Sequence, residues 1–170
     1  MSCYRVRVSG LKDGAHINTF EINNQFFELF VNNEAFNFTG KAEVTVVVKS
    51  FNTEIKIKTL GILNTKCDIC ASKIEAPISN SHTFLIKESP SPQPSTDEII
   101  YINKGQFFIN SSQYIYESIV LSIPTNINHN MKGIKDKCDK EMIQLINKYS
   151  KPVITTDPRW DKLKKIKDIK

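Results

Sequence analysis

The stretch KCDICASK, Lys66–Lys73, sets Cys67 and Cys70 three positions apart in a chain of 170 residues that has four cysteines. A Cys-x-x-Cys pair can supply two thiolates to a metal, form a redox-active disulfide, or be two free thiols that happen to be close. A redox-active pair usually opens a helix, whose N-terminus lowers the thiol pKa. Here strand-like sequence precedes and follows the pair, which favours a metal ligand pair or free thiols over a dithiol oxidoreductase.

The other residue types that carry catalysis show no catalytic arrangement in the sequence. His16, His82 and His129 have no nearby serine or carboxylate pattern of the kind that a triad or a nuclease metal pair requires. The six glycines are scattered, so the sequence has no glycine-rich phosphate loop. We therefore predict a binding protein and not an enzyme.

Positive charge is concentrated in the last quarter of the sequence. Residues 132–170 contain twelve Lys or Arg and six Asp or Glu, a balance of +6, whereas residues 1–131 contain eleven and twelve, a balance of −1. A basic end suits an anionic partner such as RNA, although a solvated lysine face that only keeps the protein soluble has the same composition.

The cations best placed to contact RNA lie in the closing stretch TTDPRWDKLKKIK. Asp157 is a predicted N-cap, Pro158 a predicted first helical residue, and Trp160, Leu163 and Ile166 form an apolar face. That face can dock on the rest of the protein while the opposite face offers cations to phosphates. The candidate RNA-binding residues are Arg159, Lys162, Lys164, Lys165, Lys167 and Lys170.

Strands are expected to position the cysteine pair. Alternating apolar residues in CYRVRVS, HINTFEI, KAEVTVVVK and TEIKIKTLG predict four strands, and the short SFNT turn predicts a hairpin of the last two. A short helix capped by Asn23 or Asn24 is predicted to carry Phe26, Phe27 and Phe30. GILNTKC leads into the cysteine pair, and KIEAPI and HTFLIKE leave it. The pair is therefore predicted to lie at the tip of a strand-to-strand connection.

The second half of the sequence is more helical. The proline-rich SPSPQPST, Ser89–Thr96, predicts an exposed loop between strands, because proline cannot donate to a strand ladder. NSSQYIYESIVLSIP has serine caps and one apolar face, and it predicts a helix that Pro124 ends. Lys137–Tyr149 predicts a second helix and the closing stretch a third. The predicted class is α+β, with an antiparallel β-rich N-terminal half containing hairpins, followed by about three helices.

The order of these pieces resembles the YceD family, the large ribosomal RNA subunit accumulation proteins. The resemblance is carried by CDIC between strands, by QYIYESIVLSIP as a helix ending in Ile-Pro, by NHNMKGIKDKCD and by DPRWDKLKKIK. NHNMKGIKDKCD places His129, Gly133 and Cys138 where the family has its His, Gly and Cys. Asp68 and Ile69 depart from the family, which usually has a basic second residue between the two cysteines.

This resemblance implies a bacterial ribosome-biogenesis factor. It would support the synthesis, processing or stability of 23S ribosomal RNA by binding that RNA, its precursor or an assembling ribosomal protein. We accordingly expect a single YceD-like α+β domain over residues 1–150 and a basic helical tail, residues 151–170, docked on it.

A zinc site is one interpretation of the cysteines. Zinc prefers four ligands, and Cys67 and Cys70 supply two. His129 and Cys138 both fall in the irregular segment between two predicted helices, and both match positions of the family, so they are the candidates for the other two. The alternatives are that Cys67 and Cys70 are free thiols left by a lost site while Cys138 packs inward at a helix start, or that the pair exchanges disulfides.

Two further expectations concern partners and location. A protein-only adaptor in ribosome assembly would use the Ser89–Thr96 loop or the cluster of Phe26, Phe27 and Phe30. No leader-like segment opens the sequence and no apolar run is long enough to cross a bilayer. We therefore expect a cytoplasmic protein with reduced thiols, without a membrane partner or a small-molecule substrate.

Overall fold

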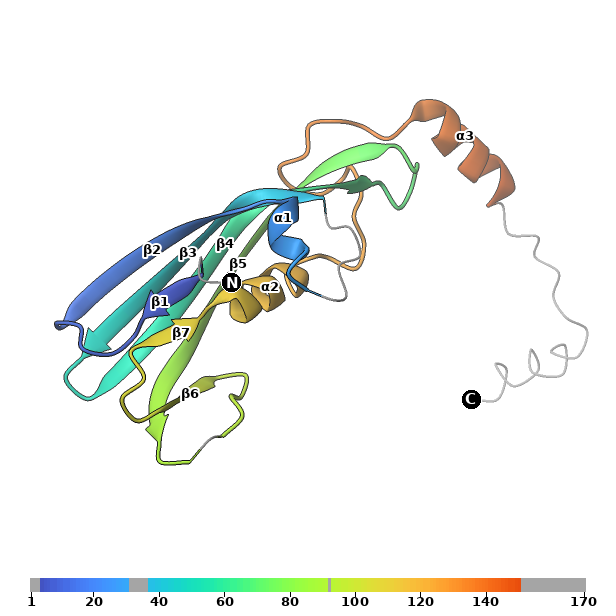
Figure 1. Cartoon of the computed structure of the whole chain (residues 1–170). Helices are drawn as coiled ribbons and strands as arrows, with labels where there is room; N and C mark the ends of the chain where they lie inside the picture. The colour runs from blue at the N-terminus through green and yellow to red at the C-terminus, as the bar shows by residue number, and fades with distance from the viewer. Residues whose placement is uncertain (1–3, 31–36, 92, 151–170) are drawn as a thin grey trace, which may run out of the picture.

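The computed structural model describes residues 4–30, 37–91 and 93–150, and Figure 1 shows their arrangement. A five-stranded sheet has the order β2-β3-β4-β5-β6, and β1 pairs with β7 in a separate two-stranded ribbon. Strands dominate the first part of the chain and helices the last, so the α+β class is confirmed. The elements are β1 (Arg5–Arg7), β2 (Gly14–Ile22), α1 (Asn24–Phe27), β3 (Phe38–Lys49), β4 (Asn52–Lys66), β5 (Lys73–Ser89), β6 (Ile99–Asn103), β7 (Phe108–Asn110), α2 (Ser112–Val120) and α3 (Lys140–Tyr149).

The long central strands form because their apolar residues alternate. β3 runs antiparallel to β4 and places Val44 opposite Ile57 and Val46 opposite Ile55. All four side chains are fully buried. A turn at residues 50–51 joins the two strands, and β4 then pairs antiparallel with β5 over fourteen residue pairs. This register gives the sheet one apolar face for the core.

The aromatic residues of α1 belong to that core. Phe26 and Phe27 are 1% and 2% exposed. Phe26 packs edge-on against Tyr4 with ring centroids 5.1 Å apart, and Phe27 packs against Phe38 and Tyr116 at 6.1 and 6.3 Å. Because these two rings are buried, they cannot form an exposed protein-binding surface. The adaptor hypothesis is therefore wrong in placing such a surface at this cluster.

Helix α2 is fixed to the sheet by apolar and polar contacts. Ile115 and Ile119, predicted on one face, are fully buried. Ser118 makes polar contacts with the sheet: its hydroxyl is 3.4 Å from that of Thr59, and its carbonyl oxygen accepts a 2.9 Å hydrogen bond from the Asn80 amide. Thr59 is 1% exposed, so this partner satisfies a polar group inside the core.

The start of α2 differs from the predicted serine cap. Ser111 occupies the cap position, but its side chain makes no bond to the helix. Its hydroxyl instead donates to the carbonyl oxygen of Tyr4 at 2.8 Å, and the Asn110 side chain accepts from the Ser112 amide. The serine therefore ties the helix to the beginning of the chain, a contact across 107 residues that local sequence does not reveal.

The connection after β5 does not form a hairpin. Residues Leu85–Ser89 of β5 pair in parallel with Ile99–Asn103 of β6, which departs from the antiparallel expectation. The proline-rich segment carries the chain back to make this pairing possible. Of the predicted loop Ser89–Thr96, residues 90–91 and 93–96 are exposed as predicted, but Ser89 is the last residue of β5 and is 5% exposed.

Helix α3 extends away from the sheet (Figure 1). It begins after Asp139, and not at Lys137 as the sequence predicted. The Asp139 carboxylate accepts hydrogen bonds from the Glu141 and Met142 amides. None of its residues is buried, and Met142 and Leu145 are 38% and 48% exposed. Among the described residues, no helix is long and apolar enough to cross a membrane. The predicted tail helix with Arg159 through Lys170 lies outside the described residues.

The β3–β4 pair has two facing glycines close to its Phe38–Leu63 end. Gly40 lies opposite Gly61, and the ring of Phe38 covers the gap that the missing side chains leave. A Cβ added to Gly61 would overlap that ring and lie 2.6 Å from the carbonyl oxygen of Thr39. Both positions therefore require glycine for steric reasons.

We expect Gly61→Ala to lower the free energy of unfolding by about 1–3 kcal/mol, since the new methyl must displace Phe38 or the Thr39 backbone. Urea denaturation followed by circular dichroism measures the change. Ser79→Ala, at an exposed position of β5, is the control and should shift the midpoint little. Equal midpoints for the two variants would contradict the packing argument.

Candidate metal centre

The cysteine pair lies at the tip of the β4–β5 hairpin, as predicted. β3 ends its pairing at Phe38 opposite Leu63, whereas β4 and β5 continue to Lys66 opposite Lys73. On the β3 side, the Asn64 amide still donates to the Asn37 carbonyl oxygen, and beyond it no described strand neighbours the hairpin. Cys67 and Cys70 occupy the turn between them and are 2% and 4% exposed.

Backbone hydrogen bonds shape this turn so that both thiols face the same way. The Cys67 amide donates to the carbonyl oxygen of Ser72, and the Ala71 amide donates to that of Cys67, both at 2.8 Å. Ala71 closes the turn with a φ of +58°, a left-handed conformation that residues other than glycine seldom adopt. No helix starts at the cysteine pair, so the thiolate stabilisation of helix-borne redox motifs is missing.

The irregular segment after α2 brings His129 to this tip. The Asp68 amide donates to the carbonyl oxygen of Ile127 at 2.8 Å, and the Ile127 amide donates back to the Asp68 carboxylate. Ile127 is also buried in the core, and His129 follows two residues later at 7% exposure. Asp68, which sequence analysis noted only as a departure from the family, is thus the residue that joins the two segments.

Cys138 reaches the tip from a different direction. Gly133, with a φ of +91°, lies against Pro77, an exposed residue of β5. A Cβ on this glycine would come 3.1 Å from the Pro77 ring. Between His129 and Cys138 the chain therefore passes close to β5. Cys138 then lies beside the cysteine pair.

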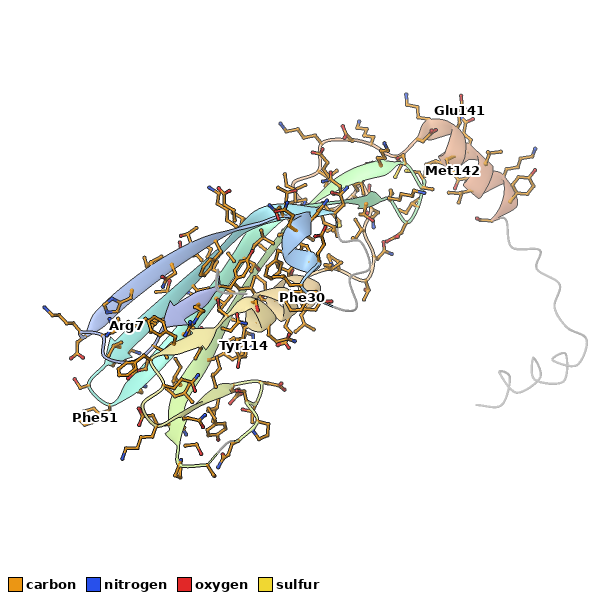
Figure 2. The ribbon with its side chains drawn as sticks, viewed as in Figure 1. Arg7, Phe30, Phe51, Tyr114, Glu141 and Met142 are labelled. Atoms are coloured by element: carbon orange, nitrogen blue, oxygen red, sulfur yellow. The ribbon has the colours of Figure 1, made fainter. Side chains whose placement is uncertain are left out.

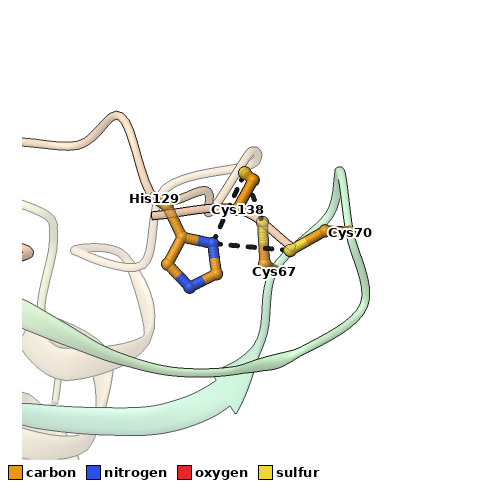
Figure 3. Close-up of side chains that lie close together, drawn as sticks. All are labelled: Cys67, Cys70, His129 and Cys138. Atoms are coloured by element: carbon orange, nitrogen blue, oxygen red, sulfur yellow. Dashed lines mark hydrogen bonds between the residues drawn. The ribbon is translucent and has the colours of Figure 1, made fainter. Parts of the chain in front are cut away.

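Three thiols and one imidazole meet at this point (Figure 3). The Cys67 and Cys138 sulfurs are 4.0 Å apart, and His129 Nδ1 is 3.5 Å from the Cys70 sulfur and 3.6 Å from the Cys138 sulfur. All four atoms lie within 4.8 Å of one another. A tetrahedral zinc ion with ordinary bond lengths requires sulfurs about 3.8 Å apart and sulfur and nitrogen about 3.5 Å apart.

The donor set and its spacing therefore fit zinc. Four protein ligands complete a tetrahedron and leave no open position for water or substrate, the arrangement of a structural site. The structure brings together all four candidate ligands, Cys67, Cys70, His129 and Cys138. His16 and His82 lie on β2 and β5 as predicted, and each ring bonds a backbone carbonyl oxygen instead.

The surroundings set the thiol pKa values unequally. Burial raises the pKa of Cys67, but amide hydrogen bonds from Cys70 and Ile69 outweigh it and bring the pKa down to about 7. The Ser72 hydroxyl, 3.1 Å away, lowers the pKa of Cys70. Burial, together with the two neighbouring thiols, raises the pKa of Cys138 to about 11. A cation at the centre would relieve the repulsion among these three groups.

Comparison with known proteins identifies a family. Residues 55–167 match a family model described as "Large ribosomal RNA subunit accumulation protein YceD". The match includes all four candidate ligands and most of the basic end of the chain. No curated protein and no solved structure matches the chain.

We predict that protein purified without chelators carries about one zinc ion per chain, because four suitable donors converge. Native mass spectrometry and elemental analysis measure the stoichiometry. Cys138→Ser should lose the ion, since it removes one of the four donors. Cys3→Ser, which removes the thiol outside this set, should retain it. Protein without metal, or equal metal content in both variants, would contradict the assignment.

Metal binding should also release protons. At about pH 8, Cys67 is mostly thiolate, whereas Cys138, with its raised pKa, still holds a proton that zinc must displace. We expect release of about one to two protons per zinc at that pH, and an apparent affinity that rises from about pH 6 to pH 8. Zinc titration of the metal-free protein in weak buffer with a pH indicator measures both, and a pH-independent affinity would argue against thiolate ligation.

Proposed function

The chain belongs to the YceD family, the large ribosomal RNA subunit accumulation proteins, and on that premise we propose that it is a non-enzymatic factor supporting the accumulation of 23S ribosomal RNA. The match over residues 55–167 is the observation that carries this proposal. Its site of action would be the bacterial cytoplasm, where the three thiols of the centre stay reduced.

The proposed partner is large-subunit ribosomal RNA or its precursor, contacted through the basic end of the chain. This end begins within the described residues, where Lys132, Lys135, Lys137 and Lys140 are all exposed. The one salt bridge found in the described part of the chain joins Lys49 to Glu54, so these lysines are not neutralised there. Because these lysines have no carboxylate partner there, RNA phosphates can pair with them.

The candidate metal centre supports this proposal by anchoring the basic end at Cys138. Cys138 is held beside Cys67 at the hairpin tip, and Asp139 caps α3 directly afterwards. When bound, zinc would supply a cross-link between the hairpin and this segment. The lysines on either side of Cys138 would then be anchored at one point of the fold. Less conformational entropy would therefore be lost when RNA binds.

The tail residues named from the sequence can be tested directly for RNA contact. We expect the triple variant Lys164→Gln, Lys165→Gln and Lys167→Gln to bind labelled 23S ribosomal RNA fragments more weakly and with a smaller salt dependence. Each lost phosphate contact on a single strand removes about 0.7 from the slope of log affinity against log salt, so three remove about 2. Fluorescence anisotropy across a potassium chloride series measures the slope.

The matched control removes the same charge from the sheet. Lys41, Lys56 and Lys58 are exposed residues of β3 and β4, and their replacement by glutamine should leave the slope unchanged. In the source cell, the tail variant should lower the ratio of 23S to 16S ribosomal RNA, and the control should not. Equal slopes for the two triple variants, or crosslinking that recovers protein and never RNA, would refute RNA binding through the tail.

A further inference from the structure

A cleft of about 450 Å³ lies between β5, helix α2 and the loop that precedes β6. Tyr114, labelled in Figure 2, lines one wall, and neither the metal centre nor the basic end takes part in it. We propose that this cleft binds an arginine-bearing segment of a partner protein. The inference goes beyond the RNA-binding proposal and does not depend on it.

Aromatic rings form a wall that suits a flat cation. The rings of His82 and Phe84 have centroids 4.6 Å apart, and those of Phe84 and Tyr114 are 5.2 Å apart. Phe84 is largely buried beneath the other two, and His82 is exposed to solvent. A guanidinium group stacks on such rings through both cation–π attraction and contact area, more favourably than the ammonium of lysine.

Carboxylates make this cleft negative, whereas the excess positive charge of the chain is concentrated in residues 132–170. Asp97 and Glu117 line the cleft in a chain whose net charge is +5, and neither forms a salt bridge with a described residue. Gln113 donates a 2.7 Å hydrogen bond to Glu117 and so orients its carboxylate. Arginine can bond a carboxylate through two parallel N–H groups, whereas RNA phosphates are repelled.

The walls of the cleft are held in place before any partner arrives. The Tyr114 hydroxyl bonds Ser95 at 3.2 Å, and the His82 ring bonds the Asp97 carbonyl oxygen at 3.1 Å. Both contacts fix the loop before β6 against the sheet and helix, so little conformational entropy is lost on binding. Leu121, 80% exposed beside the cleft, offers an apolar contact to a residue next to the arginine.

The test uses two peptides that differ in one charge. Acetyl-Leu-Arg-Leu-amide and its citrulline counterpart are titrated into the full-length, ¹⁵N-labelled protein, and amide shifts are followed by NMR. We expect the arginine peptide to shift resonances of α2 and residues 95–97 and to bind about fivefold more tightly than the citrulline peptide, the range for a partly exposed charge pair. Glu117→Gln should reduce this difference, leaving only the contribution of Asp97.

The matched control is Glu43→Gln, which neutralises an exposed carboxylate on β3 that does not line the cleft. It should preserve the preference for arginine. Equal affinity for the two peptides, or an equal effect of Glu43→Gln and Glu117→Gln, would overturn the proposal. So would an oligouridylate that shifts the same α2 resonances more strongly than the arginine peptide, because the cleft would then be a nucleic-acid site. Loss of RNA binding in the tail variant would leave all these outcomes unchanged.

Discussion

The meeting of three thiols and an imidazole at the β4–β5 tip is the contact on which the second half of the structure depends. Beyond Leu63 the hairpin has no β3 neighbour, and the segment from Ile127 to Cys138 contains no helix or strand. Few apolar groups hold this region: Ile127, 6% exposed, is the one buried hydrophobic residue that the structure describes after α2. A four-coordinate metal would close a loop of 58 intervening residues and stabilise the fold by about 4 kcal/mol on chain-entropy estimates.

Contacts within the polypeptide help to bring the four candidate ligands together. Asp68 and Ile127 exchange two hydrogen bonds, so the histidine segment is attached to the turn independently of the sulfur atoms. Ala71, directly after Cys70, has a left-handed backbone conformation with a φ of +58°. Both features cost conformational freedom or strain that a pair of unrelated free thiols would not need. The geometry therefore favours the zinc interpretation over the free-thiol alternative.

Sequence reasoning succeeded where the determining interactions are local or periodic. Alternation in β3 and β4 identified both strands and their buried faces, because a one-residue slip would expose Val44 and Val46. It failed where a partner lies far along the chain. The Ser111 hydroxyl bonds Tyr4 and not its own helix, and the Asp68 carboxylate bonds an amide 59 residues away. The parallel pairing of β6 was also missed, since composition identifies the proline-rich segment as a loop but not where it leads.

Charge separation relates the two proposed surfaces to each other. The basic end attracts phosphates, while the cleft beside α2 carries the carboxylates of Asp97 and Glu117, which repel them. RNA would thereby be directed away from the cleft, and a basic protein segment would be directed away from the lysines. The contacts among the four candidate ligands hold Cys138, within the basic end, beside the β4–β5 tip of the sheet that builds the cleft. If both proposals hold, one small domain would bind an RNA and a cationic protein segment at separate sites without competition between them.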